Sequence, residues 1–109
     1  MHMNLHETAS DHRLIVTHRG VTGGNIPCNT LPAFEIALLQ GTDMIEADVS
    51  KTADDVLCIF HPRMESRHLN SDCHIPEMTW QQVSELRYVN MNRTPTQFGI
   101  LKLDELLEH

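Results

Sequence analysis

The chain has 109 residues, and 8 Lys and Arg residues against 15 Asp and Glu residues give it a formal net charge of −7. This length allows one domain at most, and a hydrophobic content of 40% is ordinary for a globular protein. The acidic balance leaves no basic face for a phosphate backbone, which argues against nucleic-acid binding. No apolar run approaches the roughly 18 to 20 residues that a membrane-spanning helix needs.

The first thirteen residues and the cysteines bear on location. Residues 1–13 are polar and lack the apolar stretch of a secretory signal, so we expect a leader outside the domain and a cytoplasmic protein. Cysteines in an odd number without C-x-x-C spacing are typical of reduced thiols rather than of disulfides or zinc sites. They are Cys28, Cys58 and Cys73.

The first half of the chain reads as strand, helix, strand, strand. Residues 14–17 form an apolar run typical of a buried strand. Residues 31–40 have helical hydrophobic spacing behind good capping residues, and Gly41 stops that helix. Residues 44–49 alternate as a half-buried strand does, and residues 56–60 form a second buried strand that ends before a proline.

The second half is less regular. Residues 63–78 have no usable period, which predicts a loop or an insertion. Thr79 opens a capping box that predicts a helix through Leu86, residues 90–96 read as loop, and a last helix begins near Leu101. The sequence therefore predicts an α/β domain with about three strands and three helices.

Two carboxylates share one face of the strand predicted over residues 44–49. Glu46 and Asp48 would repel one another there unless a cation lay between them. Oxygen ligands favour a hard cation such as Mg²⁺ or Ca²⁺. The same alternation is equally typical of an edge strand whose acidic residues face solvent, and spacing alone does not decide between the two.

Basic side chains also stand where predicted strands end, the place at which parallel α/β folds build active sites. His18 and His61 each end an apolar strand, and a histidine pKa near 6.5 suits general acid or base catalysis. Arg19 offers a planar fork suited to phosphate. The alternatives are structural histidines and a surface ion pair. His68 and His74 lie in the irregular segment without the spacing of a zinc motif.

Taken together, these motifs resemble the glycerophosphodiester phosphodiesterase family. The matching segments, in the family's order, are residues 18–20, 29–34, 41–49, 52–55 and 56–61, and more weakly residues 78–80 and 100–107. The resemblance implies a TIM barrel that hydrolyses glycerophosphodiesters, small molecules of lipid and glycerol metabolism, to glycerol 3-phosphate and an alcohol. It also implies a divalent cation, Mg²⁺ or Ca²⁺, as cofactor.

The resemblance implies a role for each candidate residue. His18 and His61 would be the catalytic acid–base pair, Glu46 and Asp48 the metal ligands, and Arg19 the contact to the substrate phosphate. Two positions depart from the family pattern.

These departures are Cys28, where the family usually has Glu, and Pro62, where it usually has Asp. A closed eight-stranded barrel takes about 250 residues. We therefore expect residues 14–109 to be the N-terminal part of the barrel, with residues 63–78 as an insertion or loop. This chain would not close the barrel, and as a fragment without the family's third metal carboxylate it would be inactive alone. The alternative is a non-catalytic module whose open strand edges pair into a homo-oligomer or which binds a ligand.

Overall fold

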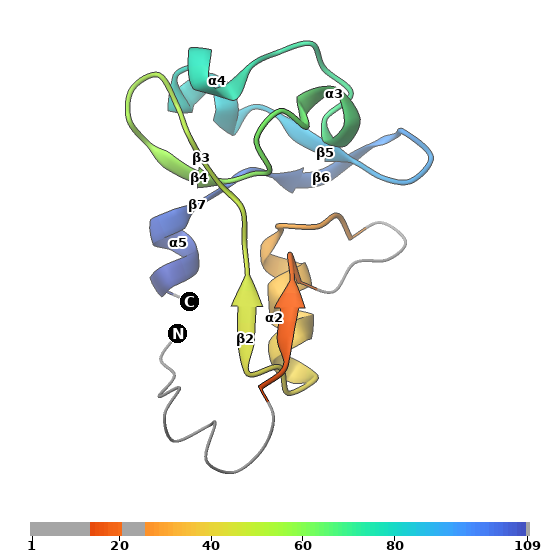
Figure 1. The fold of residues 1–109 in the computed structure, drawn as a ribbon. Coiled ribbons are helices and arrows are strands. Elements are labelled where there is room, and N and C mark those ends of the chain that lie inside the picture. The colour runs from red at the N-terminus through yellow and green to blue at the C-terminus, as the bar shows by residue number, and fades with distance from the viewer. Residues whose placement is uncertain (1–13, 21–25, 109) are drawn as a thin grey trace.

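The computed structural model describes residues 14–20 and 26–108, so the leader expected over residues 1–13 lies outside the described residues. Short strands are interspersed with short helices along the chain (Figure 1). The strands form three separate small sheets, and no barrel closes within the described residues, as predicted. The strands are β1 (Val16–His18), β2 (Met44–Glu46), β3 (Val49–Lys51), β4 (Leu57–Ile59), β5 (Arg87–Val89), β6 (Pro95–Gly99) and β7 (Leu101–Lys102). The helices are α2 (Leu31–Leu39), α3 (Glu65–His68), α4 (Trp80–Ser84), α5 (Leu103–Glu108) and the 3₁₀ helix η1 (Ile75–Glu77).

β1, α2 and β2 make a β–α–β unit in which the two strands are parallel. Helix α2 begins and ends near the predicted residues because its signals are local: Thr30 accepts a hydrogen bond from the Ala33 N–H at its start, and Gly41, with a φ of +83°, follows its end. Gly20 lies where the chain leaves β1, also with a positive φ, of +82°. A Cβ at this position would lie 2.6 Å from the Ala33 carbonyl carbon, so glycine lets the chain pass against the first turn of α2.

β4 connects two hydrophobic cores because its side chains alternate between the faces of the β3–β4–β7 sheet. Cys58 and, just beyond the strand, Phe60 join the core formed with the later segments of the chain. Ile59 packs instead with Phe34 of α2 and Leu106 of α5.

The chain between β4 and β7, residues 60–100, forms a unit of its own that we call the 60–100 segment. It contains α3, η1, α4 and the antiparallel β5–β6 hairpin, and in Figure 1 α3 and α4 lie at the top while the hairpin lies beside the β3–β4–β7 sheet. Its ends are neighbours, because Ile59 pairs with Leu101 across antiparallel strands. Its buried core members are Phe60, Leu69, Ile75, Val83, Tyr88 and Ile100.

Several predicted elements differ from the structure. The single strand predicted over residues 44–49 is two strands, since β2 pairs with β1 whereas β3 pairs with β4. The irregular residues 63–78 contain α3 and η1, and the capping box at Thr79 is confirmed, although α4 ends at Ser84. The loop predicted over residues 90–96 is the turn of the β5–β6 hairpin, which the sequence reading missed.

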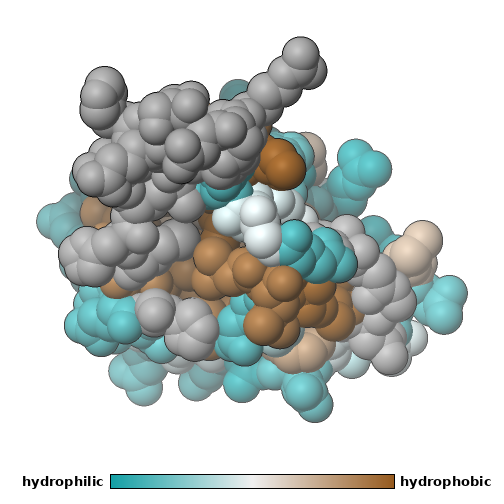
Figure 2. All heavy atoms as spheres, turned by 90° about the horizontal axis from the view of Figure 1, so that it is seen from below, coloured by the Kyte–Doolittle hydropathy of each residue, from teal (hydrophilic) through white to brown (hydrophobic). Residues whose placement is uncertain are grey.

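The first predicted strand is exposed rather than buried. Ile15 and Val16 are 58% and 55% exposed, and the end of α2 adds Leu39 at 88%. Figure 2, which views the molecule from below, shows a hydrophobic surface on this face. Among the described residues, no helix is long and apolar enough to cross a membrane.

Candidate active site

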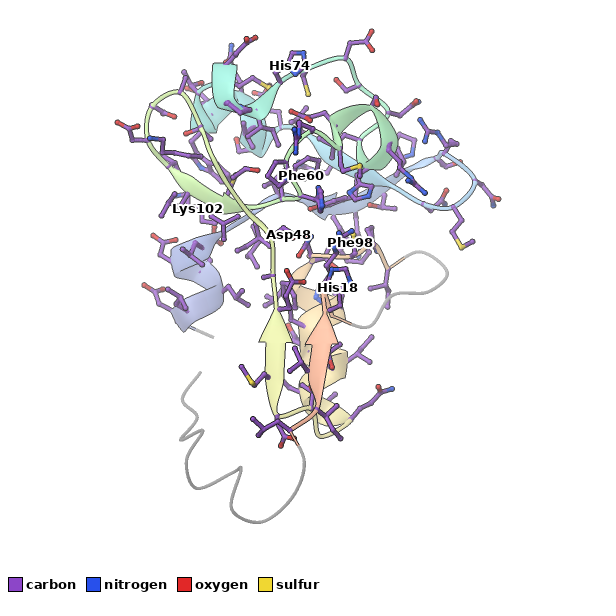
Figure 3. The ribbon with its side chains drawn as sticks, in the orientation of Figure 1. His18, Asp48, Phe60, His74, Phe98 and Lys102 are labelled. Carbon is purple, nitrogen blue, oxygen red and sulfur yellow. The ribbon has the colours of Figure 1, made fainter. Side chains whose placement is uncertain are left out.

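The parallel pairing of β1 and β2 brings two candidate side chains together. His18 and Glu46 are register partners at the ends of these strands, and His18 Nε2 lies 3.2 Å from Glu46 Oε2. The contact is an ion pair when the imidazole is protonated. His18 lies at the tip of β1, below Asp48 in Figure 3. The strand ends thus form one edge of the site.

Asp48 follows β2 and is held by three contacts. The fully buried Asn29 donates from Nδ2 to Asp48 Oδ2 at 3.0 Å and accepts at Oδ1 from the Asp48 N–H at 3.3 Å. Arg19 Nε lies 2.9 Å from the same carboxylate oxygen. Burial pushes the pKa of Asp48 upward, but the Asn29 hydrogen bond and the charges of Arg19 and His61 outweigh it and leave that pKa below its ordinary value. Asp48 is therefore an anion at neutral pH.

Backbone hydrogen bonds fix the position of Arg19. Its N–H donates to the Glu46 carbonyl at 2.7 Å, and its carbonyl accepts from the Asn29 N–H at 2.9 Å. Both Arg19 and Asn29 have positive φ, at 59° and 60°. Non-glycine residues rarely adopt this conformation, and such residues cluster at functional sites. Arg19 Nε is buried and is not aligned to donate a hydrogen bond, despite its short distance to Asp48.

His61 reaches the site from β4. The Phe60 N–H donates to the Asp48 carbonyl at 2.9 Å, which places the next residue, His61, beside Asp48. His61 Nδ1 lies 2.9 Å from the Pro62 carbonyl oxygen. Because a carbonyl oxygen only accepts, Nδ1 carries the proton in this contact, and in the neutral ring Nε2 is the free acceptor.

The donor set fits a divalent cation. Within the described ranges, one group of His18, Glu46 and Asp48 has ligand atoms that all lie within 4.8 Å of one another. In the part of the chain that the structure describes, no donor is aligned to the buried Glu46 Oε2, so this oxygen has an unused lone pair in the middle of the group. Two carboxylates favour a hard cation, while an imidazole also suits transition metals.

The structure brings all five candidate residues of the sequence to one place and adds others beside them. Asn29 is not among the five candidates, yet it binds Asp48 through two hydrogen bonds. Cys28, which the sequence marks as a departure from the family pattern, lies beside Arg19; burial raises the pKa of its thiol, and the Arg19 charge opposes that effect. Burial, together with the charges of Arg19 and His61, lowers the pKa of His68. No sequence signal marks His68, since its neighbours at the site come from other segments.

Comparison with known proteins decides the family. The model of the glycerophosphoryl diester phosphodiesterase family matches residues 18–109. The chain belongs to this family. Among glycerophosphoryl diester phosphodiesterase relatives, a probable glycerophosphodiester phosphodiesterase 1 of Mycobacterium tuberculosis is 35% identical over 82 residues, which cover 75% of this chain and 30% of that protein. A glycerophosphodiester phosphodiesterase of Caldanaerobacter subterraneus is 34% identical over 73 residues.

Solved structures of glycerophosphoryl diester phosphodiesterases have the same fold. A glycerophosphodiester phosphodiesterase from Agrobacterium tumefaciens superposes with a TM-score of 0.77 at 33% identity, covering 90% of this chain and 42% of that one. A phosphodiesterase from Oleispira antarctica, in complex with the product sn-glycerol-3-phosphate, superposes with a TM-score of 0.74 at 28% identity, covering 92% of this chain and 40% of that one. The chain thus spans less than half the length of these relatives. The predicted family and fold, part of a TIM barrel, are confirmed.

Proposed function

We propose that the full-length protein is a divalent-cation-dependent phosphodiester hydrolase that cleaves glycerophosphodiesters to glycerol 3-phosphate and an alcohol. The observation that carries the proposal is the convergence of His18, Glu46 and Asp48 beside Arg19 and His61. The family supports the reaction class, and the product bound to the Oleispira antarctica relative supports the substrate class. The chain spans only 30% of its Mycobacterium tuberculosis relative, so we propose that further barrel strands complete the site.

The acidic and guanidinium groups bind the phosphodiester in this proposal. Glu46 and Asp48 hold the cation, which when bound offsets negative charge on the phosphate. Arg19 is fixed by its backbone contacts and directs its guanidinium to a phosphate oxygen. The ion pair with Asp48 keeps that guanidinium in place before substrate arrives.

The two histidines move the protons. The free Nε2 of neutral His61 accepts a proton from water as the water oxygen attacks phosphorus. The bond from phosphorus to the alcohol oxygen breaks, and protonated His18, stabilised by Glu46, donates its proton to that oxygen. The products are glycerol 3-phosphate and the free alcohol, with one proton taken up by His61 and one released by His18. We therefore propose His61 as the base and His18 as the acid.

The reaction is tested by measuring release of glycerol 3-phosphate from glycerophosphocholine by the full-length protein. We expect activity with Mg²⁺ or Ca²⁺ and none in a chelator. His61→Gln and His18→Gln should each lower kcat by about 10²- to 10⁴-fold. His74→Gln, which changes a histidine outside the site, is the matched control. Equal activity with and without chelator, or no product with either cation, would contradict the proposal.

Cation binding is tested on this chain directly by calorimetry with Mg²⁺ and Ca²⁺. Glu46→Gln and Asp48→Asn should each weaken binding, because each removes one negative ligand. Asp72→Asn removes the same charge from an exposed position and should leave the affinity unchanged. Equal loss in all three variants would show that only net charge matters and would refute a site at Glu46 and Asp48.

Location and assembly follow from other features of the chain. The three cysteines are unpaired, which supports a reducing, cytoplasmic location. The exposed apolar residues of β1 support pairing of strand edges between copies of the chain. Light scattering that gives a monomer mass at high concentration would refute the pairing, and a stable dimer without hydrolysis in the full-length protein would favour the non-catalytic alternative.

A further inference from the structure

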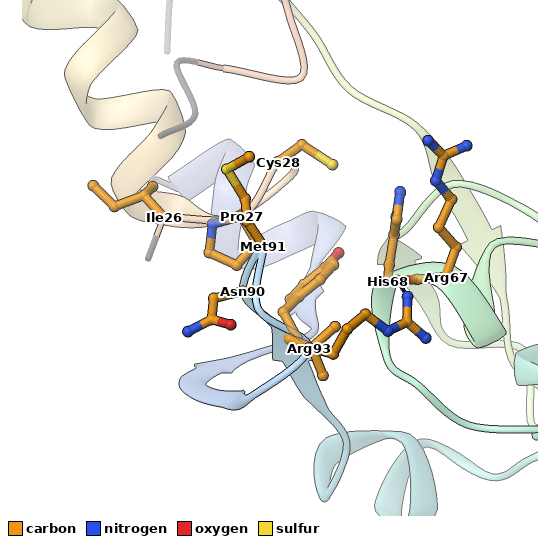
Figure 4. A pocket seen from close by; sticks show the side chains of 10 residues that line it. Ile26, Pro27, Cys28, Arg67, His68, Asn90, Met91 and Arg93 are labelled. Atoms are coloured by element: carbon orange, nitrogen blue, oxygen red, sulfur yellow. Dashed lines mark hydrogen bonds between the residues drawn. The ribbon is translucent and has the colours of Figure 1, made fainter. Parts of the chain in front are cut away.

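A cavity of about 520 Å³ lies between the loop that precedes α2 and the 60–100 segment (Figure 4). Ile26, Pro27 and Met91 give it an apolar wall, and α3 and the β5–β6 hairpin contribute basic and polar side chains. Its volume is within the range of pockets for small molecules. The size and the mixed lining suit one compact organic group.

The cavity adjoins the candidate active site through two of its lining residues. Cys28 lines the cavity and lies close enough to Arg19 for the guanidinium charge to act on its thiol. His68 also lines the cavity and packs edge-on against Phe60, with 5.9 Å between the ring centres. Burial lowers the pKa of His68, and Arg19 and His61 are close enough for their charges to lower it further. A substrate whose phosphate lies at Arg19 can therefore extend one of its two alcohol groups into the cavity.

Among the described residues that line the cavity, the charged ones are Arg67 and Arg93, and none is a carboxylate. This is notable in a chain with a net charge of −7. Asp72 lines a neighbouring groove with both arginines but forms no ion pair with either. The cavity is therefore a basic site on an acidic protein, which favours an anionic ligand.

Arg93 and Arg67 have different roles in the cavity. Arg93 donates to the Ser66 and Arg67 carbonyls at 2.9 and 3.1 Å and to Asn70 Oδ1 at 2.7 Å, so its guanidinium is used in holding the last turn of α3. The side chain of Arg67 makes no hydrogen bond or ion pair with the residues that the structure describes. Its planar fork is available for a ligand, on a backbone that Arg93 fixes.

We propose that this cavity is the subsite for the alcohol portion of the substrate and that Arg67 selects alcohols that carry an anionic group, a phosphate or a carboxylate. The inference rests on the proposed function in treating the ligand as a substrate, whereas binding of an anion at Arg67 does not depend on hydrolysis. A cationic alcohol such as choline gains nothing from Arg67. The specificity-determining residue thus lies in the 60–100 segment, outside the group of residues that carries the chemistry.

The test compares binding of three diesters to this chain by ¹H–¹⁵N and methyl NMR titration. The probes are glycerophosphocholine, glycerophosphoserine and glycerophosphoinositol 4-phosphate, so the last two separate a carboxylate from a phosphate. We expect the anionic probes to shift the Met91 methyl and His68 ring signals. Arg67→Gln should weaken their binding about tenfold and leave glycerophosphocholine within twofold of its original affinity. Lys51→Gln, which removes the same charge at a strand on the β3–β4–β7 sheet, is the control.

Each outcome decides between the two proposals. Equal binding of all three diesters, no shift at Met91 and His68, or equal losses in Arg67→Gln and Lys51→Gln would overturn the subsite. The proposed function would still stand if the full-length protein released glycerol 3-phosphate from glycerophosphocholine. Selective binding through Arg67 without any release of glycerol 3-phosphate would sustain the anion site and refute the proposed hydrolysis.

Discussion

Two glycines with nearly the same backbone conformation allow the contact between β1 and α2 to be measured. Gly20 and Gly41 have φ values of +82° and +83°. Placing alanine at a left-handed position costs about 1–2 kcal/mol, and both variants incur this cost. Alanine also restricts the unfolded chain equally in the two variants, so that effect cancels in the comparison.

The surroundings of the two glycines differ sharply. A Cβ at Gly41 meets nothing within 4 Å, whereas at Gly20 it would lie 2.6, 2.7 and 2.8 Å from the carbonyl carbon, the carbonyl oxygen and the Cβ of Ala33. Ordinary contacts of this kind are 3.4–4 Å, so backbone must move by more than half an ångström. Overpacking of this kind costs about 1–3 kcal/mol. Gly20→Ala should therefore lower the free energy of unfolding by about 2–5 kcal/mol, and Gly41→Ala by about 1–2 kcal/mol.

Urea denaturation followed by circular dichroism measures both values. Gly20→Ala should also shift the backbone amide signals of Arg19 and Glu46, since the two residues share a hydrogen bond next to the substituted position. A variant that fails to fold still counts as the larger loss if Gly41→Ala folds. Losses that agree within about 0.5 kcal/mol would refute the argument, because they would leave no free energy for the clash with Ala33.

Three further substitutions test the site and its support. Asn29→Ala should raise the pKa of Asp48 toward its ordinary value, as measured by carboxyl NMR, and an unchanged titration would contradict the role of Asn29. A depressed carboxyl pKa stabilises the fold at pH values above the pKa of the unfolded state, and this stabilisation is lost as the pH falls through the pKa of the folded state. The variant should therefore lose less stability on acidification than the original chain. Cys28→Glu adds a carboxylate near Asp48 and should tighten Ca²⁺ binding in calorimetry, whereas Cys28→Gln should not. Equal Ca²⁺ affinities of these two variants would place residue 28 away from the cation. Arg93→Gln removes three charge-assisted hydrogen bonds of an exposed side chain and should lower the free energy of unfolding by about 1–2 kcal/mol in a urea titration. A loss below about 0.3 kcal/mol would show that α3 does not depend on these bonds.

Local signals explain what the sequence predicted correctly. Helix α2 and the start of α4 depend on Thr30, Thr79 and Gly41, whose capping bonds and positive φ involve residues only a few positions away. His18 and His61 are found because they end apolar runs, and Glu46 and Asp48 because they alternate with apolar residues along one predicted strand. Strand ends are a short-range feature of sequence even when the site that they form is long-range.

The errors come from partners that a single sequence does not specify. The alternation of residues 44–49 continues without a break, but the hydrogen-bond partner changes from β1 to β4 in the middle of it. The β5–β6 hairpin turns at Arg93 with a φ of 64° rather than at a glycine, so its turn carries no strong signal. The exposure of Val16 likewise depends on which elements cover β1, a tertiary property.

The pairing of Ile59 with Leu101 has a consequence for how this protein could diversify. A stretch of chain that departs from a sheet and rejoins it at paired positions behaves as a cassette: it can be lengthened, replaced or redesigned while the sheet keeps its register. The exchanged residues must present apolar side chains that fit the face of Cys58, and they must keep the backbone hydrogen bonds to Asp48 and Ala53. Exchanging residues 60–100 between relatives, with His61 retained, should therefore transfer the preference for one alcohol over another while leaving Glu46 and Asp48 in place.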